Sequence, residues 1–320
     1  MLCRRFTLSV VVLLSLTYIS IHAQTPRAAV DRYEEGGRKL KKGDLDGAIE
    51  DFSKAIRISS RLDGDKHAPS LSRSNSFAES SAEAAGITVI DPLTAQAYTS
   101  RGLARYRKGD IDGAISDWDM AIRIHPGLAE TYVNRGAARY AKGDSQGALD
   151  DWGRAIQVSP RLAAAYCNRG SLRLDLNDLE GALADLDKAI DLDPRDAKAR
   201  CHRGYALLKK QDLDGALADL NKAIELDAGL AWGYQGRGLV RMDKLEFDSA
   251  IADFSRALEL DPSMVYAYAN RGLTLLLKNR DSEAEKDFAR ALEINPMIKG
   301  SLDERIKLAK EFRPAPAVRP

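Results

Sequence analysis

The sequence predicts an all-α fold built from stacked helical hairpins, and three observations lead to that prediction. An Arg-Gly pair recurs every 34 residues in six copies. Within each copy, apolar residues return at three- and four-residue spacing on both sides of a short polar break, which is the period of an amphipathic helix. Gly and Ala recur where two such helices would cross closely. Because one hairpin cannot bury its apolar face alone, the copies are expected to stack on their neighbours.

Each copy, called a repeat below, has small and large residues at fixed places counted from its first residue. Gly stands at place 8, Ala at places 20 and 27, and a large apolar residue at place 24 between them. A seventh repeat lies upstream and carries Gly36, Ala48, Phe52 and Ala55. The repeats are placed at residues 29–62, 95–128, 129–162, 163–196, 197–230, 231–264 and 265–298.

This order of residues resembles the tetratricopeptide repeat (TPR) family, whose 34-residue pattern has an aromatic residue, Gly, Ala, an aromatic residue and Pro in the same order. Arg32 and Arg200 replace the aromatic residue of place 4 in two repeats. The other five repeats keep it, as Tyr98, Tyr132, Tyr166, Tyr234 and Tyr268. The resemblance implies a right-handed superhelical solenoid that binds proteins, is not an enzyme and needs no cofactor.

The N-terminal residues 1–23 are expected to be a signal peptide. Arg4 and Arg5 precede an apolar run, and the small residue Ala23 ends it, which is the order of a cleavable export signal. The protein is therefore expected to be exported, to a periplasm or out of the cell. The alternative is an uncleaved anchor at residues 6–21, the one case in which a membrane would be a partner.

Two further segments interrupt or end the repeat pattern. Residues 63–94 contain six serines and no matching repeat, and are expected to be a flexible insertion. Residues 299–312 are expected to form a capping helix that begins with a capping box of Ser301 and Glu304. Residues 313–320 then form a Pro-rich tail.

Composition excludes several classes of function. The formal net charge of the 320 residues is +1, so no basic field points to nucleic acid. Four His and three Cys are too few for most metal frameworks, and no metal site is expected. Cys167 and Cys201 stand at the same place of adjacent repeats, and the sequence leaves open whether they form a disulfide.

Charged residues of opposite sign also repeat in step. Arg at place 7 is matched by Asp at place 23 of the same repeat in six repeats, which predicts structural ion pairs between the two helices of a hairpin. The first repeat has Glu35 and Asp51 instead, so a looser geometry is expected there. The alternative is an arginine ladder that binds acidic ligands. The predicted pairs are Arg101 with Asp117, Arg135 with Asp151, Arg169 with Asp185, Arg203 with Asp219, Arg237 with Asp253, and Arg271 with Asp287.

The TPR resemblance implies that the first helix of each repeat lines a concave groove, with places 2, 5, 6 and 9 facing it. Aromatic and amide side chains at such places suit an extended peptide, by anchoring and by hydrogen bonds to its backbone. The partner is therefore expected to be a protein segment, and a glycan or small acidic ligand of the cell envelope is the alternative. The candidate groove residues are Asn134, Asn168, His202, Tyr205, Trp232, Tyr266 and Asn270.

One motif suggests a different class of function. Residues 143–147 match the Gly-x-Ser-x-Gly pattern of a hydrolase nucleophile, which would make Ser145 catalytic. That motif needs a preceding strand to expose the serine, whereas the same place in sister repeats is a turn between two helices. We therefore expect Ser145 to be a turn residue and the protein not to be a hydrolase.

Overall fold

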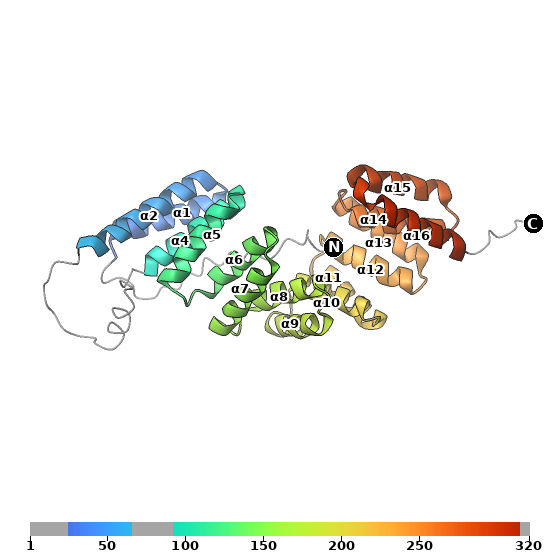
Figure 1. The fold of residues 1–320 in the computed structure, drawn as a ribbon, viewed down its shortest axis with the longest axis horizontal. Helices are drawn as coiled ribbons and strands as arrows, with labels where there is room; N and C mark the ends of the chain where they lie inside the picture. Colours follow the sequence, from blue (N-terminus) through green and yellow to red (C-terminus); the bar gives the residue numbers. More distant parts are fainter. Residues whose placement is uncertain (1–24, 66–91, 314–320) are drawn as a thin grey trace, which may run out of the picture. The chain divides into compact units, whose positions relative to one another are not determined.

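The computed structural model describes residues 25–65 and 92–313, and within these ranges every regular element is helical (Figure 1). This confirms the all-α prediction. The chain divides into two compact units, Met1–Arg169 and Gly170–Pro320, and the boundary falls inside one helix, α8. None of the described helices is long and apolar enough to cross a bilayer. The predicted signal peptide and most of the predicted insertion lie outside the described residues.

Each repeat is a pair of helices that pack against each other. The first helices are α1 (Arg27–Lys42), α4 (Pro92–Lys108), α6 (Ala129–Ala141), α8 (Ala163–Asp175), α10 (Ala197–Lys209), α12 (Ala231–Asp243) and α14 (Val265–Leu277). The second helices are α2 (Leu45–Asp65), α5 (Ile111–Ile124), α7 (Ser145–Val158), α9 (Leu179–Leu192), α11 (Leu213–Leu226), α13 (Phe247–Leu260) and α15 (Asp281–Ile294). The 3₁₀ turn η1 (Pro296–Ile298) and α16 (Lys299–Phe312) follow.

The turn inside each hairpin follows from two residue types. Place 15 adopts a left-handed backbone conformation, which Gly43, Gly109 and Gly143 accept without steric cost. The Asp at place 16 then caps the second helix, as when Asp110 Oδ1 accepts the backbone N–H of Gly113 at 3.0 Å. An Asp holds place 16 in five repeats, so these two places explain the helix boundaries there, whereas Glu246 and Arg280 hold place 16 in the last two repeats and make no side-chain cap.

Leu245 occupies the left-handed place 15 in its repeat, with φ of 61° and 72% of its surface exposed. An L-residue with a long side chain pays about 1 kcal/mol for this conformation and gains no burial in return. Leu245→Gly is therefore expected to raise the free energy of unfolding by about 1 kcal/mol in urea titration. As a control, Leu308→Gly removes a half-exposed leucine from inside α16 and should lower stability by a similar amount. A loss of stability in Leu245→Gly would contradict the argument.

Close approach of the two helices depends on the glycine at place 8. A Cβ at Gly136 would lie 2.7 Å from Nε1 of Trp152, and Trp152 is fully buried between the helices. The indole N–H of Trp152 donates to the carbonyl of Val133 at 3.2 Å. The alanines of places 20 and 27 are fully buried or nearly so in every repeat, from Ala48 to Ala291. The structure confirms the predicted packing of a large side chain against small ones.

The first two repeats pack as neighbours although the predicted insertion separates them in sequence. α2 packs against α4, and Lys108 on α4 pairs with Asp46 on α2. The helices also extend into the segment predicted as insertion, because α2 continues to Asp65 and α4 begins at Pro92, where Leu93 and Thr94 are buried. Residues 63–65 and 92–94, which were predicted to belong to the insertion, are therefore helical.

A ladder of ion pairs links consecutive repeats. The Lys of place 14 pairs with the acidic residue of place 18 in the preceding repeat. The ladder contains the pairs Lys108 with Asp46, Lys142 with Asp112, Lys210 with Glu180, Lys244 with Asp214 and Lys278 with Asp248. All five acidic partners are exposed, so each pair adds little to stability.

The C-terminal helix α16 occupies the predicted residues 299–312 and packs mainly on α14. Its buried Leu302 joins the apolar cluster of the last repeat. The predicted capping box is wrong. The N-cap residue is Ile298, and Ser301 lies inside the helix, where its hydroxyl donates to the Ile298 carbonyl at 3.0 Å. The 3₁₀ turn η1 starts the helix early and leaves Ser301 no free backbone N–H to cap.

Candidate functional site

Five of the seven candidate groove residues lie in the unit Gly170–Pro320, on three first helices that pack in a row. His202 and Tyr205 are on α10, Trp232 is on α12, and Tyr266 and Asn270 are on α14. α12 packs against both α10 and α14, so the row is continuous. Asn134 on α6 and Asn168 on α8 belong to the other unit and are both buried.

A hydrogen bond links the side chain of Tyr205 to the backbone of Trp232. The Tyr205 hydroxyl donates to the carbonyl of Trp232 at 3.0 Å. Room for the Tyr205 ring comes from Gly236, because a Cβ there would lie 3.0 Å from the ring and 2.8 Å from Leu220. Gly236 stands at place 6, where three sister repeats carry Asn. The Tyr205 ring from α10 thus occupies space that an Asn side chain at place 6 of α12 would need.

Trp232 is half-buried and rests on apolar residues of its own hairpin and the next. The cluster beneath it comprises Ala231, Ala257, Leu258, Met264 and Ala267. Packing on this cluster limits the rotamers of the indole while part of its surface stays accessible. Such a side chain can anchor a partner at low entropic cost.

His202 is buried and its imidazole is held neutral. Desolvation by burial, with a smaller contribution from the nearby Lys198 ammonium, lowers the pKa of His202 to about 3. Place 6 therefore presents an uncharged imidazole at neutral pH, comparable with the asparagine of the sister repeats. His202 is 4% exposed, so it packs inside this part of the row and adds no charge to its surface.

This pKa shift predicts a pH dependence of stability. Below its ordinary pKa of 6.5 the unfolded chain binds a proton at His202, whereas the folded chain stays neutral down to about pH 3. Stability is thus fully present above pH 6.5 and is lost as pH falls, by about 2 kcal/mol between pH 8 and pH 5. Urea titrations at both pH values should show this loss. His202→Asn, which copies the sister repeats, should remove most of it, and an unchanged loss in that variant would contradict the assignment.

The end of the row, at the last repeat, is covered by α16. Arg305 Nη2 donates to Asn270 Oδ1 at 2.8 Å, and Asn270 is almost fully buried. Tyr266 packs against the cluster that includes Leu302 and is joined by Ile306. Asn270 and much of Tyr266 are therefore engaged by the chain itself. Of the three candidates on α10 and α12, Trp232 is the one that is partly exposed, because His202 and Tyr205 are buried.

In five repeats the arginine of place 7 contacts both carboxylate oxygens of the aspartate of place 23, as predicted pairs of this kind require. Nε and Nη2 of Arg237 contact the two carboxylate oxygens of Asp253 at 2.9 and 2.7 Å. Arg101, Arg135, Arg203 and Arg271 hold Asp117, Asp151, Asp219 and Asp287 in the same way. In the five repeats with a tyrosine at place 4, the Arg also lies over its ring, as Arg101 does over Tyr98 at 5.2 Å. This geometry favours the structural interpretation.

Sequence reasoning missed a second cation at most of these carboxylates. The Arg of place 11 also reaches the Asp of place 23, as Arg241 Nη1 reaches Asp253 at 2.7 Å. In the first repeat, Arg32 and Lys39 hold the buried Asp51, while Glu35 pairs with Arg38 instead. The sequence does show Arg or Lys at place 11 of most repeats. It does not show that this side chain points toward the aspartate of place 23.

One buried polar side chain near the row was also missed. Gln235 is fully buried on α12, and both polar atoms of its amide have no hydrogen-bond partner. Burial raises the pKa of Asp243 at the end of α12. Burial also raises the pKa of the Cys201 thiol, which makes that thiol a poor nucleophile. Cys167, in the other unit, is buried as well. Among the described residues, no group of His, Cys, Asp and Glu is placed to hold a metal ion.

Ser145 is the first residue of α7 and follows a helix, not a strand. The preceding Asp144 caps α7 by accepting the N–H of Gly147 at 2.9 Å. The Gly-x-Ser-x-Gly match thus falls on the same turn as in the sister repeats. The strained strand-to-helix elbow that exposes a hydrolase serine does not form at this position.

Comparison with known proteins places these repeats in a family. The model described as tetratricopeptide repeat matches residues 66–129, 167–231 and 236–296, together more than half of the chain. No curated protein matches the chain significantly.

Among solved structures, a tetratricopeptide repeat protein from Parabacteroides merdae ATCC 43184 is similar, with 20% identity, 89% of this chain and 99% of that chain covered, and a TM-score of 0.60. The APC/C hetero-tetramer Cut9–Hcn1 is similar at 15% identity over 83% of this chain and 55% of that one, with a TM-score of 0.61. YrrB, described as a TPR protein with an unusual peptide-binding site, has 22% identity, coverage of 61% and 98%, and a TM-score of 0.46. At these identities the first two likenesses show the fold alone.

Proposed function

The chain belongs to the tetratricopeptide repeat family, and from this premise we propose that it is a non-enzymatic scaffold that binds a peptide segment of a partner protein. Proteins of this family generally bind other proteins, and the matched family is a repeat scaffold and no catalytic one. The binding face proposed for this chain is the row of first helices α10 and α12.

The half-buried indole of Trp232 is the observation that carries the proposal. It is held against an apolar cluster, and the Tyr205 hydroxyl fixes the backbone carbonyl of the same residue at 3.0 Å. Large, preorganised aromatic side chains provide much of the affinity in peptide recognition. The buried, neutral His202 on α10 adds no charge to this face. The contact between Arg305 and Asn270 ends the available face at α16.

The test is crosslinking of the full-length protein in its native envelope, followed by identification of the captured proteins. Trp232→Ala is expected to lower capture of a specific partner about tenfold or more, while melting stays close to that of the wild type. Tyr234→Ala is the matched control, because Tyr234 packs against the same cluster but lies beneath Arg237 at 5.5 Å and away from the proposed face. Equal losses in both variants, or none in Trp232→Ala, would move the site elsewhere.

The alternative ligand is a glycan or a small acidic molecule of the envelope. Direct titration of the purified protein with envelope sugars separates the two proposals. Saturable sugar binding that Trp232→Ala abolishes, without any specific protein captured, would favour the glycan receptor.

We further propose that the protein is exported. The support is the charged, apolar and small order of residues 1–23 in the sequence. N-terminal sequencing of the protein from its native cells is expected to begin at Gln24. A chain that begins at Met1 and fractionates with membranes would favour the uncleaved anchor.

A further inference from the structure

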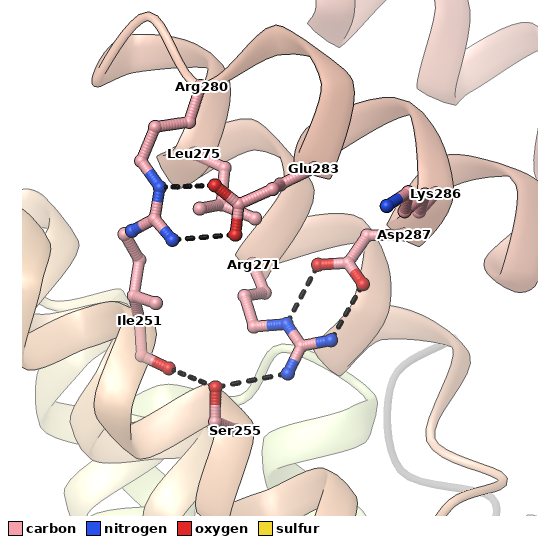
Figure 2. A pocket seen from close by; sticks show the side chains of 8 residues that line it. All are labelled: Ile251, Ser255, Arg271, Leu275, Arg280, Glu283, Lys286 and Asp287. Atoms are coloured by element: carbon pink, nitrogen blue, oxygen red, sulfur yellow. Dashed lines mark hydrogen bonds and ion pairs between the residues drawn. The ribbon is translucent and has the colours of Figure 1, made fainter.

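A cavity of about 350 Å³ lies between α13, α14 and α15, apart from the proposed peptide face. Figure 2 shows the Arg280 and Glu283 side chains on one side of it and Arg271, Asp287 and Ser255 on the other. Its volume is at the lower end of the range for small-ligand sites, about 300–1,000 Å³. The lining residues are Ile251, Ser255, Arg271, Leu275, Arg280, Glu283, Lys286 and Asp287.

Two replacements together open this cavity, and each also occurs singly elsewhere, as Ser53 at place 25 and Leu207 at place 11. At place 11 the last repeat has Leu275, where Arg241 of the preceding repeat fills the equivalent space and reaches the carboxylate of Asp253. At place 25 of the preceding repeat stands Ser255, where two other repeats have the longer aspartates Asp119 and Asp187. Both replacements remove polar atoms that sister repeats direct into this space.

Sister repeats also show what the space accommodates. Nη1 of Arg135 donates to the Asp119 carboxylate at 2.5 Å, and Nη1 of Arg203 donates to Asp187 at 2.8 Å. In the last repeat the same nitrogen of Arg271 meets only the Ser255 hydroxyl, at 3.0 Å, and that hydroxyl donates onward to the Ile251 carbonyl. Arg271, like Arg101 beside Ser53, therefore lacks the second carboxylate that Arg135 and Arg203 contact through Nη1.

The charges around the cavity favour an anion over a cation. Three basic and two acidic side chains line it, which gives the lining a net charge of +1. Asp287 is held by Arg271, and Glu283 is held by Arg280 through two hydrogen bonds of 2.8 and 2.6 Å. Lys286 makes no ion pair with any residue in the described part of the chain. An incoming cation would face this excess positive charge, whereas a carboxylate would neutralise it.

We propose that this cavity binds a carboxylate side chain from an acidic segment of a partner protein, which takes the position beside Arg271 that Asp119 and Asp187 occupy beside their arginines. The Nη1 of Arg271 and the Ser255 hydroxyl form one wall of the site, and Arg280 and Lys286 provide the remaining positive charge. The site lies on different helices from Trp232, so it adds a second contact to that proposed for the peptide face.

The test uses the full-length protein and blocked pentapeptides that carry one charge or none. Gly-Gly-Glu-Gly-Gly, acetylated and amidated, is titrated while the side-chain Nε–Hε resonances of Arg271 and Arg280 are followed by NMR. The glutamate peptide is expected to shift both resonances saturably, and Gly-Gly-Gln-Gly-Gly is expected to leave them unchanged. Equal shifts with both peptides, or none with either, would overturn the proposal. So would tighter binding of Gly-Gly-Lys-Gly-Gly, which would make the cavity a cation site.

Two variants copy residues that sister repeats already carry, so they are expected to fold. Ser255→Asp supplies the carboxylate from within the chain and should weaken binding of the glutamate peptide about tenfold or more. Leu275→Arg refills the cavity and should do the same. Asn221→Asp makes an equivalent change one repeat earlier, beside Arg237, and should leave binding unchanged. Unaltered affinity in Ser255→Asp and Leu275→Arg would overturn the proposal. A free dicarboxylate, glutarate, that binds the protein and is not displaced by the glutamate peptide would overturn it as well.

Discussion

Asp253→Ala is expected to lower the free energy of unfolding by about 3–5 kcal/mol, because it leaves two guanidinium groups without a carboxylate inside the protein. Asp253 is 3% exposed and contacts both Arg237 and Arg241 within 2.9 Å. The Arg237 and Arg241 side chains are only 17% and 24% exposed, so water compensates little of their charge when the carboxylate is removed. Urea titration followed by circular dichroism measures the loss.

Two other aspartates provide graded controls for this prediction. Asp287→Ala removes the carboxylate of Arg271 alone, so a smaller loss is expected. Asp248→Ala removes a 78% exposed partner of Lys278, and its effect should stay below about 1 kcal/mol. Equal effects of all three substitutions would show that burial and the number of cations do not determine the energy of these pairs.

Trp152→Ala is expected to cost about 3–5 kcal/mol, because a fully buried indole leaves a cavity that the surrounding helices cannot close. Gly136 has no side chain to fill the space that the indole leaves. The hydrogen bond from the indole N–H to the Val133 carbonyl is lost as well. Hydrogen exchange should rise first in α6 and α7, since repeats are stabilised by their nearest neighbours. Equilibrium urea unfolding gives the magnitude.

The loss should depend on the volume removed and the burial of the site. Trp152→Leu is expected to cost about half as much, because Leu186 and Leu220 hold this place in two sister repeats. Trp232→Ala, the same chemical change at a half-buried indole, should cost less than half of the Trp152→Ala value. A Trp152→Ala protein as stable as Trp232→Ala would contradict the packing argument.

Much of the fold could be predicted because the same packing pattern occurs in every repeat and is therefore seen several times along the chain. Gly136 and Trp152 stand at places that recur in every repeat, so chance patterns average out and the hairpin follows from spacing alone. The start of the second helix was equally predictable in the first five repeats, since Asp144 and its counterparts are strong N-cap residues.

The parts of the structure that could not be predicted depend on contacts that are formed only once in the chain. α16 was expected from its amphipathic pattern, but its docking on α14 and the Arg305 contact to Asn270 depend on tertiary packing that no period encodes. The capping box at Ser301 failed because the preceding turn η1 moved the helix start by three residues. The cavity beside Arg271 depends on Ser255 and Leu275 being neighbours, whereas Ser53 and Leu207 hold the same two places singly in other repeats.

The ladder of exposed ion pairs between repeats has an evolutionary consequence. Each rung joins place 14 of one repeat to place 18 of the one before, so the rule is the same at successive junctions in the second unit. Deleting residues 231–264 as a block would bring Lys278 opposite Asp214, which now pairs with Lys244. Duplicating that block would create another rung of the same kind. Whole repeats can thus be gained or lost without placing like charges together, which makes the length of such a chain easy to change by recombination.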